Sequence, residues 1–122
     1  MLPRAFTALV LLLATLLVAG CATPPPHELP RPSDGDIAEL AREITALGPD
    51  IDPAEARRAA QIAYDYPLRL AVRYEIEDPP YIHNIKVNQG IKPRGLCWHW
   101  ARDMEHRLRQ ENFATLDLHR AV

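Results

Sequence analysis

An uncharged apolar stretch at the start of the chain limits most strongly what the chain can fold into. Residues 5–20 carry no charged side chain and consist largely of leucine, valine and alanine. Arg4 precedes this stretch, and the small pair Ala19-Gly20 ends it directly before Cys21. A short basic region, an apolar core and small residues before a cleavage point are typical of a secretory signal peptide. We therefore predict that residues 1–20 are a signal peptide and do not belong to the folded domain.

The end of this stretch contains a second pattern. The sequence Leu-Val-Ala-Gly-Cys at positions 17–21 resembles a bacterial lipobox, in which the cysteine becomes the acylated first residue of the mature protein. The resemblance implies that Cys21 is lipidated and anchors the chain in the bacterial cell envelope, since several acyl chains give stable membrane attachment. Ala22 stands where lipoproteins retained in the inner membrane usually have aspartate, which favours a periplasm-facing place in the outer membrane. An ordinary secretory signal is the alternative.

Charge and cysteine content narrow the possible partners. Removing Arg4 from the 14 basic residues leaves 13 against 16 acidic residues, without a basic cluster, so we expect no nucleic-acid partner. If Cys21 carries lipid, Cys97 has no partner within the chain, and an unpaired thiol in an oxidising compartment calls for an explanation. A disulfide between Cys21 and Cys97 is the alternative, and it requires a Cys21 without lipid.

The remaining sequence divides into a tether and a helical region. Proline is frequent in residues 21–35 and apolar side chains are few, so we predict a lipidated cysteine followed by an extended tether. The domain is then expected over residues 36–122. Its first helix is predicted over 36–47, capped by one of three polar residues and stopped by Gly48. The caps are Ser33, Asp34 or Asp36, and the apolar face is Ile37, Leu40, Ala41, Ile44 and Leu47.

A second helix begins with a strong start pattern. Asp52 is the expected N-cap, Pro53 the first helical residue and Glu55 the glutamate of a capping box. Pro67 lies inside the helical pattern, and we expect it to kink a helix that continues to about Tyr74. The side chains expected to be buried along it are Ala56, Ala59, Ala60, Ala63 and Leu70.

Three further elements are predicted. Residues 81–89 favour a short helix stopped by Gly90, with a strand as the alternative. Helical spacing resumes at Cys97 and predicts a helix to about Gln110. Residues 115–122 alternate between apolar and polar side chains and predict a strand, although no other segment offers a pairing partner.

Residues able to do chemistry concentrate just before and within the helix that begins at Cys97. A thiol at a helix N-terminus is stabilised as the thiolate by unpaired N–H groups and by the helix dipole. Acyl transfer by cysteine also requires a base, normally histidine. His99 and His106 point away from Cys97 by helical geometry. His119 on the predicted strand is the candidate base, and His83 stays possible through loop packing.

The sequence Gly-Leu-Cys-Trp at 95–98, leading into a helix and then a strand, resembles the nucleophile segment of transglutaminase-like and papain-like cysteine enzymes. A wider pattern is similar to a group of uncharacterised proteobacterial lipoproteins over residues 54–122. The residues that carry it are His83-Asn84, Val87-Asn88, Gly90, Arg94-Gly95-Leu96-Cys97, His99-Trp100 and Leu116-Asp117-Leu118-His119.

The resemblance implies an antiparallel sheet behind the nucleophile helix, whose later strands supply a histidine and then an aspartate. Only Cys97 corresponds to a family functional residue, so we expect the front half of this fold, truncated at the C-terminus and inactive as given. We predict a mainly α fold for this sequence and an α+β fold for a complete domain. The implied reaction is acyl transfer or amide hydrolysis without a cofactor. Protein glutamine or asparagine side chains and peptidoglycan peptides are the substrate classes that the compartment allows.

Two other interpretations stay open. Cys97 is equally compatible with a small buried packing residue, since free cysteine is among the most buried residue types. The protein is then a non-enzymatic lipoprotein adaptor that binds an envelope partner through Trp98, Trp100 and its tyrosines. A zinc site is not expected, because Cys-x-His is not a customary ligand spacing and no second ligand pair exists.

Overall fold

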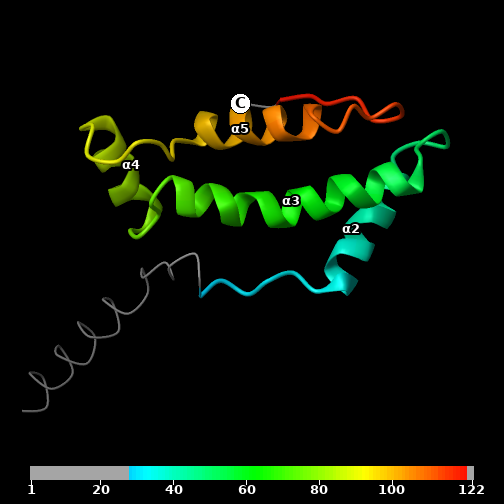
Figure 1. Ribbon diagram of the computed structural model, residues 1–122, viewed down its shortest axis with the longest axis horizontal. Coiled ribbons are helices and arrows are strands. Elements are labelled where there is room, and N and C mark those ends of the chain that lie inside the picture. The colour runs from blue at the N-terminus through cyan, green and yellow to red at the C-terminus, as the bar shows by residue number, and fades with distance from the viewer. Residues whose placement is uncertain (1–27, 121–122) are drawn as a thin grey trace, which may run out of the picture.

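The computed structural model describes residues 28–120, which form four helices joined by loops (Figure 1). The predicted signal peptide, Cys21 and residues 22–27 of the predicted tether lie outside the described residues. The helices are α2 (Asp34–Thr45), α3 (Pro53–Arg73), α4 (Pro80–Asn88) and α5 (Cys97–Arg109). The predicted mainly α fold is therefore confirmed for the described part. No helix within residues 28–120 is both long and apolar enough to cross a membrane.

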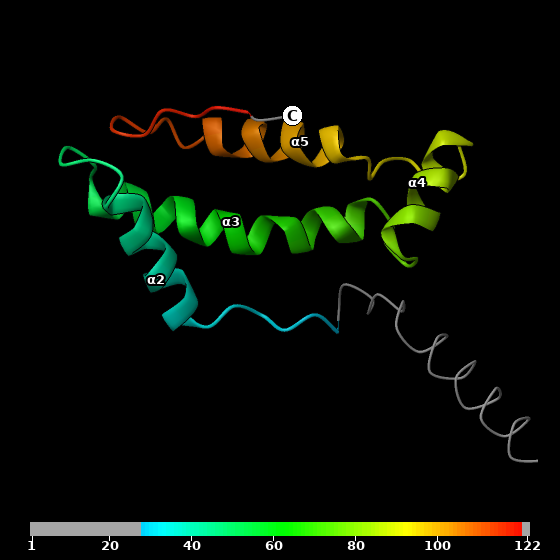
Figure 2. The same cartoon turned by 180° about the vertical axis from the view of Figure 1, so that it is seen from behind.

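The long helix α3 is the central element, and the other helices are arranged around it. Helix α2 crosses its N-terminal part, and α5 runs antiparallel along it on another side, as Figures 1 and 2 show from opposite directions. The short helix α4 lies beyond the C-terminal end of α3 and leads the chain back to the start of α5. Helix α3 packs against α2 and α5, more extensively against α2. This return places the first turn of α5 near the end of α3.

Helix α2 begins at one of the predicted caps. Ser33 Oγ accepts a hydrogen bond from the Asp36 N–H at 3.2 Å, and the Asp36 carboxylate accepts one from the Ser33 N–H at 2.8 Å. These two bonds form a complete capping box. The helix therefore starts at Asp34, and the last two residues of the predicted tether are helical.

The apolar face of α2 is mostly as predicted. Ile37 and Ala41 are buried, and they form a core cluster with Ala60 of α3, whose small side chain lets the two helices approach closely. The prediction for Leu47 is wrong, because α2 ends at Thr45 and the Leu47 side chain is 80% exposed beyond it.

Helix α3 confirms the predicted start and extent, but not the capping box. Asp52 Oδ1 accepts hydrogen bonds from the N–H groups of Ala54 and Glu55 at 2.7 and 2.9 Å. The helix runs unbroken through Pro67. Glu55 does not bond back to the Asp52 N–H. Its carboxylate instead accepts three hydrogen bonds from Ala114 and Thr115, near the other end of the described chain.

The burial expected along α3 also holds in part. Ala56, Ala60 and Leu70 are fully buried and Ala59 is 8% exposed, whereas Ala63 is exposed. Ala63 lies on the same face as Ala56 and Ala60, but α2 crosses only the N-terminal part of α3 (Figure 1) and does not cover it.

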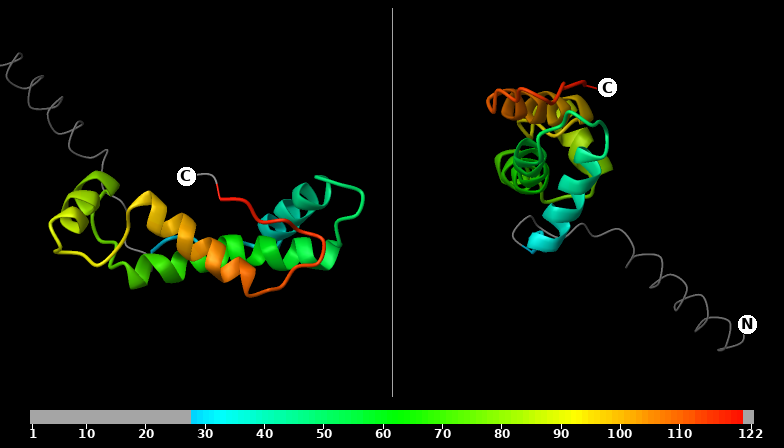
Figure 3. Two further views of the ribbon diagram at one scale, coloured as in Figure 1. Left: turned by 90° about the horizontal axis from the view of Figure 1, so that it is seen from above. Right: turned by 90° about the vertical axis from the view of Figure 1, so that its right-hand side faces the viewer.

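The later helices follow their predictions, whereas the strand does not form. Residues 80–88 are helical rather than extended, and α5 begins at Cys97. Thr115 lies in a bend, and residues 116–120 are drawn out (Figure 1) but do not form a strand, because nothing else within residues 28–120 supplies a strand to pair with. This segment turns back along α5 (Figures 1 and 3). The last two residues of the predicted strand, 121–122, lie outside the described residues.

Candidate active-site turn

Cys97 is the first residue of α5, and its thiol is free and exposed. The residue before it, Leu96, is the N-cap and has extended backbone angles. Residues 94–96 therefore form a turn that carries the chain from the loop after α4 into α5. We call residues 94–96 the Cys97 turn. The backbone conformation of this turn sets the position of the Cys97 thiol.

His99 fixes the end of this turn from inside the helix. It lies at the third position of α5 and is 7% exposed. Its Nδ1 atom accepts hydrogen bonds from the N–H groups of Gly95 and Leu96, at 3.1 and 3.2 Å. Two donors facing Nδ1 keep that nitrogen unprotonated, and burial together with the nearby positive charge of Arg94 lowers the pKa of His99. His99 is therefore a neutral positioning residue, occupied by the turn rather than available to Cys97.

His83 of α4 holds the other side of the turn. It is 1% exposed, and its Nε2 donates a hydrogen bond to the Arg94 carbonyl at 2.8 Å. Gly95 has a φ of +136°, and a Cβ at that position would collide with His83 Nε2 and Cδ2. Glycine is therefore required there for close approach as well as for its backbone angle. His83, which the sequence left open as a base, packs instead against the backbone two residues before the thiol.

The two tryptophans of α5 point in different directions, because residues two positions apart do not share a helical face. Trp100 Nε1 donates a hydrogen bond to the Gly95 carbonyl at 2.9 Å, and its ring packs edge-on against Tyr74, with centroids 4.8 Å apart. Trp98 is 48% exposed and lies against the His99 ring. The three side chains His83, His99 and Trp100 thus hold four backbone polar atoms of the Cys97 turn, from the Arg94 carbonyl to the Leu96 N–H.

A partly buried polar cluster joins this turn to the end of α3. The Tyr74 hydroxyl donates to Asp103 Oδ2 at 2.6 Å and also lies 3.2 Å from the His99 carbonyl. Arg94 donates to the second carboxylate oxygen of Asp103 at 2.8 Å. Tyr74 is completely buried, and burial together with the Asp103 hydrogen bond raises its pKa to about 12. No sequence pattern pointed to Asp103, because only folding brings it from the second turn of α5 to the end of α3.

His119 lies away from the Cys97 turn. It is exposed, and the next residue, Arg120, forms an ion pair with Glu105 at 3.3 Å. Glu105 is eight residues after Cys97, which is about 12 Å along a helix axis. No hydrogen bond joins Cys97 to a histidine anywhere in residues 28–120. His83 and His99 thus lie at the turn and hydrogen-bond to its backbone, whereas the candidate base, His119, does not lie beside the thiol.

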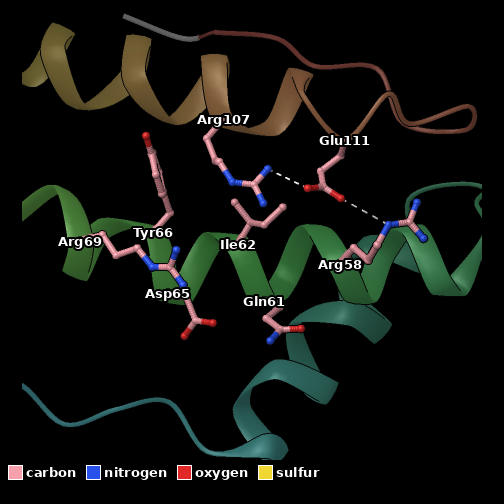
Figure 4. A pocket seen from close by; sticks show the side chains of 8 residues that line it. All are labelled: Arg58, Gln61, Ile62, Asp65, Tyr66, Arg69, Arg107 and Glu111. Atoms are coloured by element: carbon pink, nitrogen blue, oxygen red, sulfur yellow. Dashed lines mark hydrogen bonds and ion pairs between the residues drawn. The ribbon is translucent and has the colours of Figure 1, made fainter.

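A separate polar groove lies between α3 and α5 (Figure 4). Its volume is about 240 Å³. Glu111 lies at one end between two arginines, 2.7 Å from Arg107 and 3.5 Å from Arg58 (Figure 4). No cysteine or histidine lines the groove, so it is distinct from the Cys97 turn. The residues that line it are Arg58, Gln61, Ile62, Asp65, Tyr66, Arg69, Arg107 and Glu111.

We compared the chain with known proteins to find relatives with a similar site. Comparisons of the chain with models of protein families, with curated proteins and with solved structures found no match. Over the described part of the chain, no three histidine, cysteine, aspartate or glutamate side chains are grouped so that they could hold a metal ion. The candidate site therefore rests on the thiol and on the geometry of the turn that holds it.

Proposed function

We propose that the chain is a lipid-anchored protein of the bacterial cell envelope, most of it facing the periplasm. Its domain presents Cys97 as the thiol nucleophile of a transglutaminase-like acyltransferase or amide hydrolase. Lipid on Cys21 supplies the anchor, and the outer membrane is the favoured location. The catalytic part of the proposal is supported by the exposed Cys97 thiol at the start of α5. The turn before it is held by hydrogen bonds from side chains to four of its backbone atoms.

An exposed thiol beside a turn held by hydrogen bonds is more typical of a nucleophile than of a packing residue. A packing cysteine is buried, whereas the Cys97 side chain is exposed while its neighbours His99 and His83 are buried. A held turn keeps the thiol and the free N–H groups of the helix start in one arrangement before substrate arrives. Such an arrangement lowers the barrier, because orientation and charge stabilisation need no reorganisation during the reaction.

The proposed reaction is nucleophilic substitution at an amide. The thiolate of Cys97 attacks the carbonyl carbon, the carbonyl electrons move onto oxygen, and helix-start N–H groups stabilise that oxyanion. The C–N bond then breaks, the amine leaves with a proton, and a thioester remains. Water or a second amine attacks the thioester and restores the thiol. His119 is the candidate base, and because it does not contact Cys97, we expect a reactive thiol without efficient turnover for the chain as given.

The rate of alkylation by iodoacetamide at pH 7 tests this proposal. The full chain and its C97A variant are compared in the folded state and in denaturant, so that labelling of Cys21 is subtracted. We expect Cys97 to react several-fold faster in the folded chain than in the denatured chain, because the helix start favours the thiolate. Alkylation that occurs only after unfolding would refute the nucleophile proposal.

One observation favours a second candidate, the non-enzymatic adaptor. Helix α4 leaves Tyr81, Ile82 and Ile85 exposed, and Trp98 is half exposed beside Cys97. Large exposed apolar side chains are typical of surfaces that bind another protein. The alkylation experiment separates the two candidates, since an adaptor has no reason to keep Cys97 more reactive than an ordinary thiol.

A further inference from the structure

The extended segment 116–119 has backbone hydrogen-bonding groups without partners. In the part of the chain that the structure describes, no hydrogen bond involves the N–H or C=O of these four residues. The side chains nevertheless alternate as in a strand, with Leu116 and Leu118 half-buried and Asp117 and His119 exposed. An extended segment with free backbone groups is a template for pairing with another strand.

Both ends of this segment are held in place. At its start, the Glu55 carboxylate accepts hydrogen bonds from the Thr115 N–H at 2.8 Å and hydroxyl at 2.6 Å, and the Asp52 N–H donates to the same hydroxyl. At its end, Arg120 pairs with Glu105 of α5. The segment therefore keeps its extended shape without a neighbouring strand, so a partner strand need not order it on binding.

We propose that residues 116–120 pair antiparallel with the same residues of a second copy of this chain. In the register centred on Leu118, each Leu118 lies opposite its equivalent and each Asp117 lies opposite the other copy's His119. The imidazole donates a charge-assisted hydrogen bond to the facing carboxylate, and the two-fold symmetry makes this contact twice. In this register the Asp117–His119 face is complementary by charge, and the other face places Leu118 against Leu118.

Charge selects this register over the nearest alternatives. A parallel in-register pairing places Asp117 opposite Asp117, and like charges directly opposite each other are destabilising. A shift by one residue places the half-buried leucines opposite the exposed polar residues, because strand side chains alternate between faces. Of these three pairings, only the antiparallel one centred on Leu118 places Leu118 opposite Leu118 and Asp117 opposite His119. This proposal does not depend on the chemistry proposed for Cys97.

Cysteine cross-linking of the full chain in detergent tests the register. In a C97S background, L118C and L116C each replace one half-buried leucine of the same face. Two residues opposite each other in an antiparallel pair have Cα atoms about 4.5–5.5 Å apart, within disulfide range. We therefore expect mild oxidation to convert L118C to a disulfide dimer at least tenfold faster than L116C, which faces Arg120. Equal rates for the two variants would overturn the proposal.

A charge exchange provides the second test, in the L118C background. H119D places acid opposite acid and is expected to slow dimer formation about tenfold, with unchanged helical circular dichroism. The double variant D117H/H119D exchanges the two groups and is expected to restore the original rate, since each acid again faces an imidazole. A double variant as slow as H119D would show that the two residues do not face each other, and would refute the register.

Discussion

Gly95 combines a φ of +136° with direct contact between its backbone and the His83 ring. The Gly95 N–H is bound by His99 and its carbonyl by Trp100. The geometry at the thiol therefore depends on a residue that has no side chain.

We predict that Gly95→Ala destabilises the fold by about 3 kcal/mol, because it adds backbone strain and a collision with His83. Urea unfolding followed by circular dichroism measures this change. Gly90→Ala is the matched control, since Gly90 also has a positive φ, +74°, but a Cβ there meets nothing within 4 Å. Its expected cost is the backbone strain alone, about 1 kcal/mol. Equal effects of the two variants would mean that His83 does not press on the turn.

The start of α3 shows how one element can be held by a distant part of the chain. Glu55 has the position of a capping-box glutamate, yet its carboxylate binds Ala114 and Thr115 rather than its own helix start. These hydrogen bonds, with the Ala114 N–H contributing most, lower the pKa of Glu55. The Asp52 N–H, which a capping-box glutamate would bind, donates instead to the Thr115 hydroxyl, so the Glu55 side chain is available for this second task.

We predict that Glu55→Gln removes the hydrogen-exchange protection of at least one of the Ala114 and Thr115 amides, since these two N–H groups bind different carboxylate oxygens and the glutamine NH₂ group cannot accept from either. In the unmutated chain, the stabilisation from ionised Glu55 is fully present above about pH 4.3, the ordinary glutamate pKa, and is lost as pH falls below it through the lowered pKa. Exchange measured by mass spectrometry at neutral pH checks the variant. Glu43→Gln, on the exposed face of α2, is the control and should leave both amides protected.

Across the whole molecule, the end of α3 and the start of α5 are joined by Tyr74, Asp103 and Arg94. Tyr74 is completely buried and donates to a carboxylate that also binds a guanidinium. This partly buried cluster links the helix that packs on α2 to the helix that begins with the thiol. The protonation state of the Tyr74 hydroxyl therefore affects the free energy of unfolding of the whole domain.

We predict a stability loss in alkali that depends on Tyr74. Its pKa rises from 10.0 to about 12 on folding, so the folded state holds the proton more tightly than the unfolded state. That stabilisation is fully present below pH 10 and is lost as the pH rises towards 12, a change of about 2–3 kcal/mol. Urea unfolding across this range measures the slope. A slope in the Tyr74→Phe variant as steep as in the unmutated chain would contradict the assignment to Tyr74.

Local patterns were enough to predict most elements. Capping residues and helical spacing placed the starts of α3 and α5 at the observed residues, because these signals act over one or two helical turns. The same local reasoning placed Cys97 at a helix start and His99 facing away from it. It was wrong for the C-terminal strand, because a strand exists only with a neighbour, and alternation in one segment carries no information about that neighbour.

By itself, the sequence determined the helical content, the caps and the place of the thiol at the first residue of a helix. Tertiary structure alone decided what surrounds that thiol. His83, Tyr74 and Asp103 come from three different elements and reach the Cys97 turn only because α4 folds the chain back onto the end of α3. Likewise, Glu55 meets Thr115 across 60 residues of chain. Contacts between distant segments depend on how whole helices pack, and no short pattern within one segment records that packing.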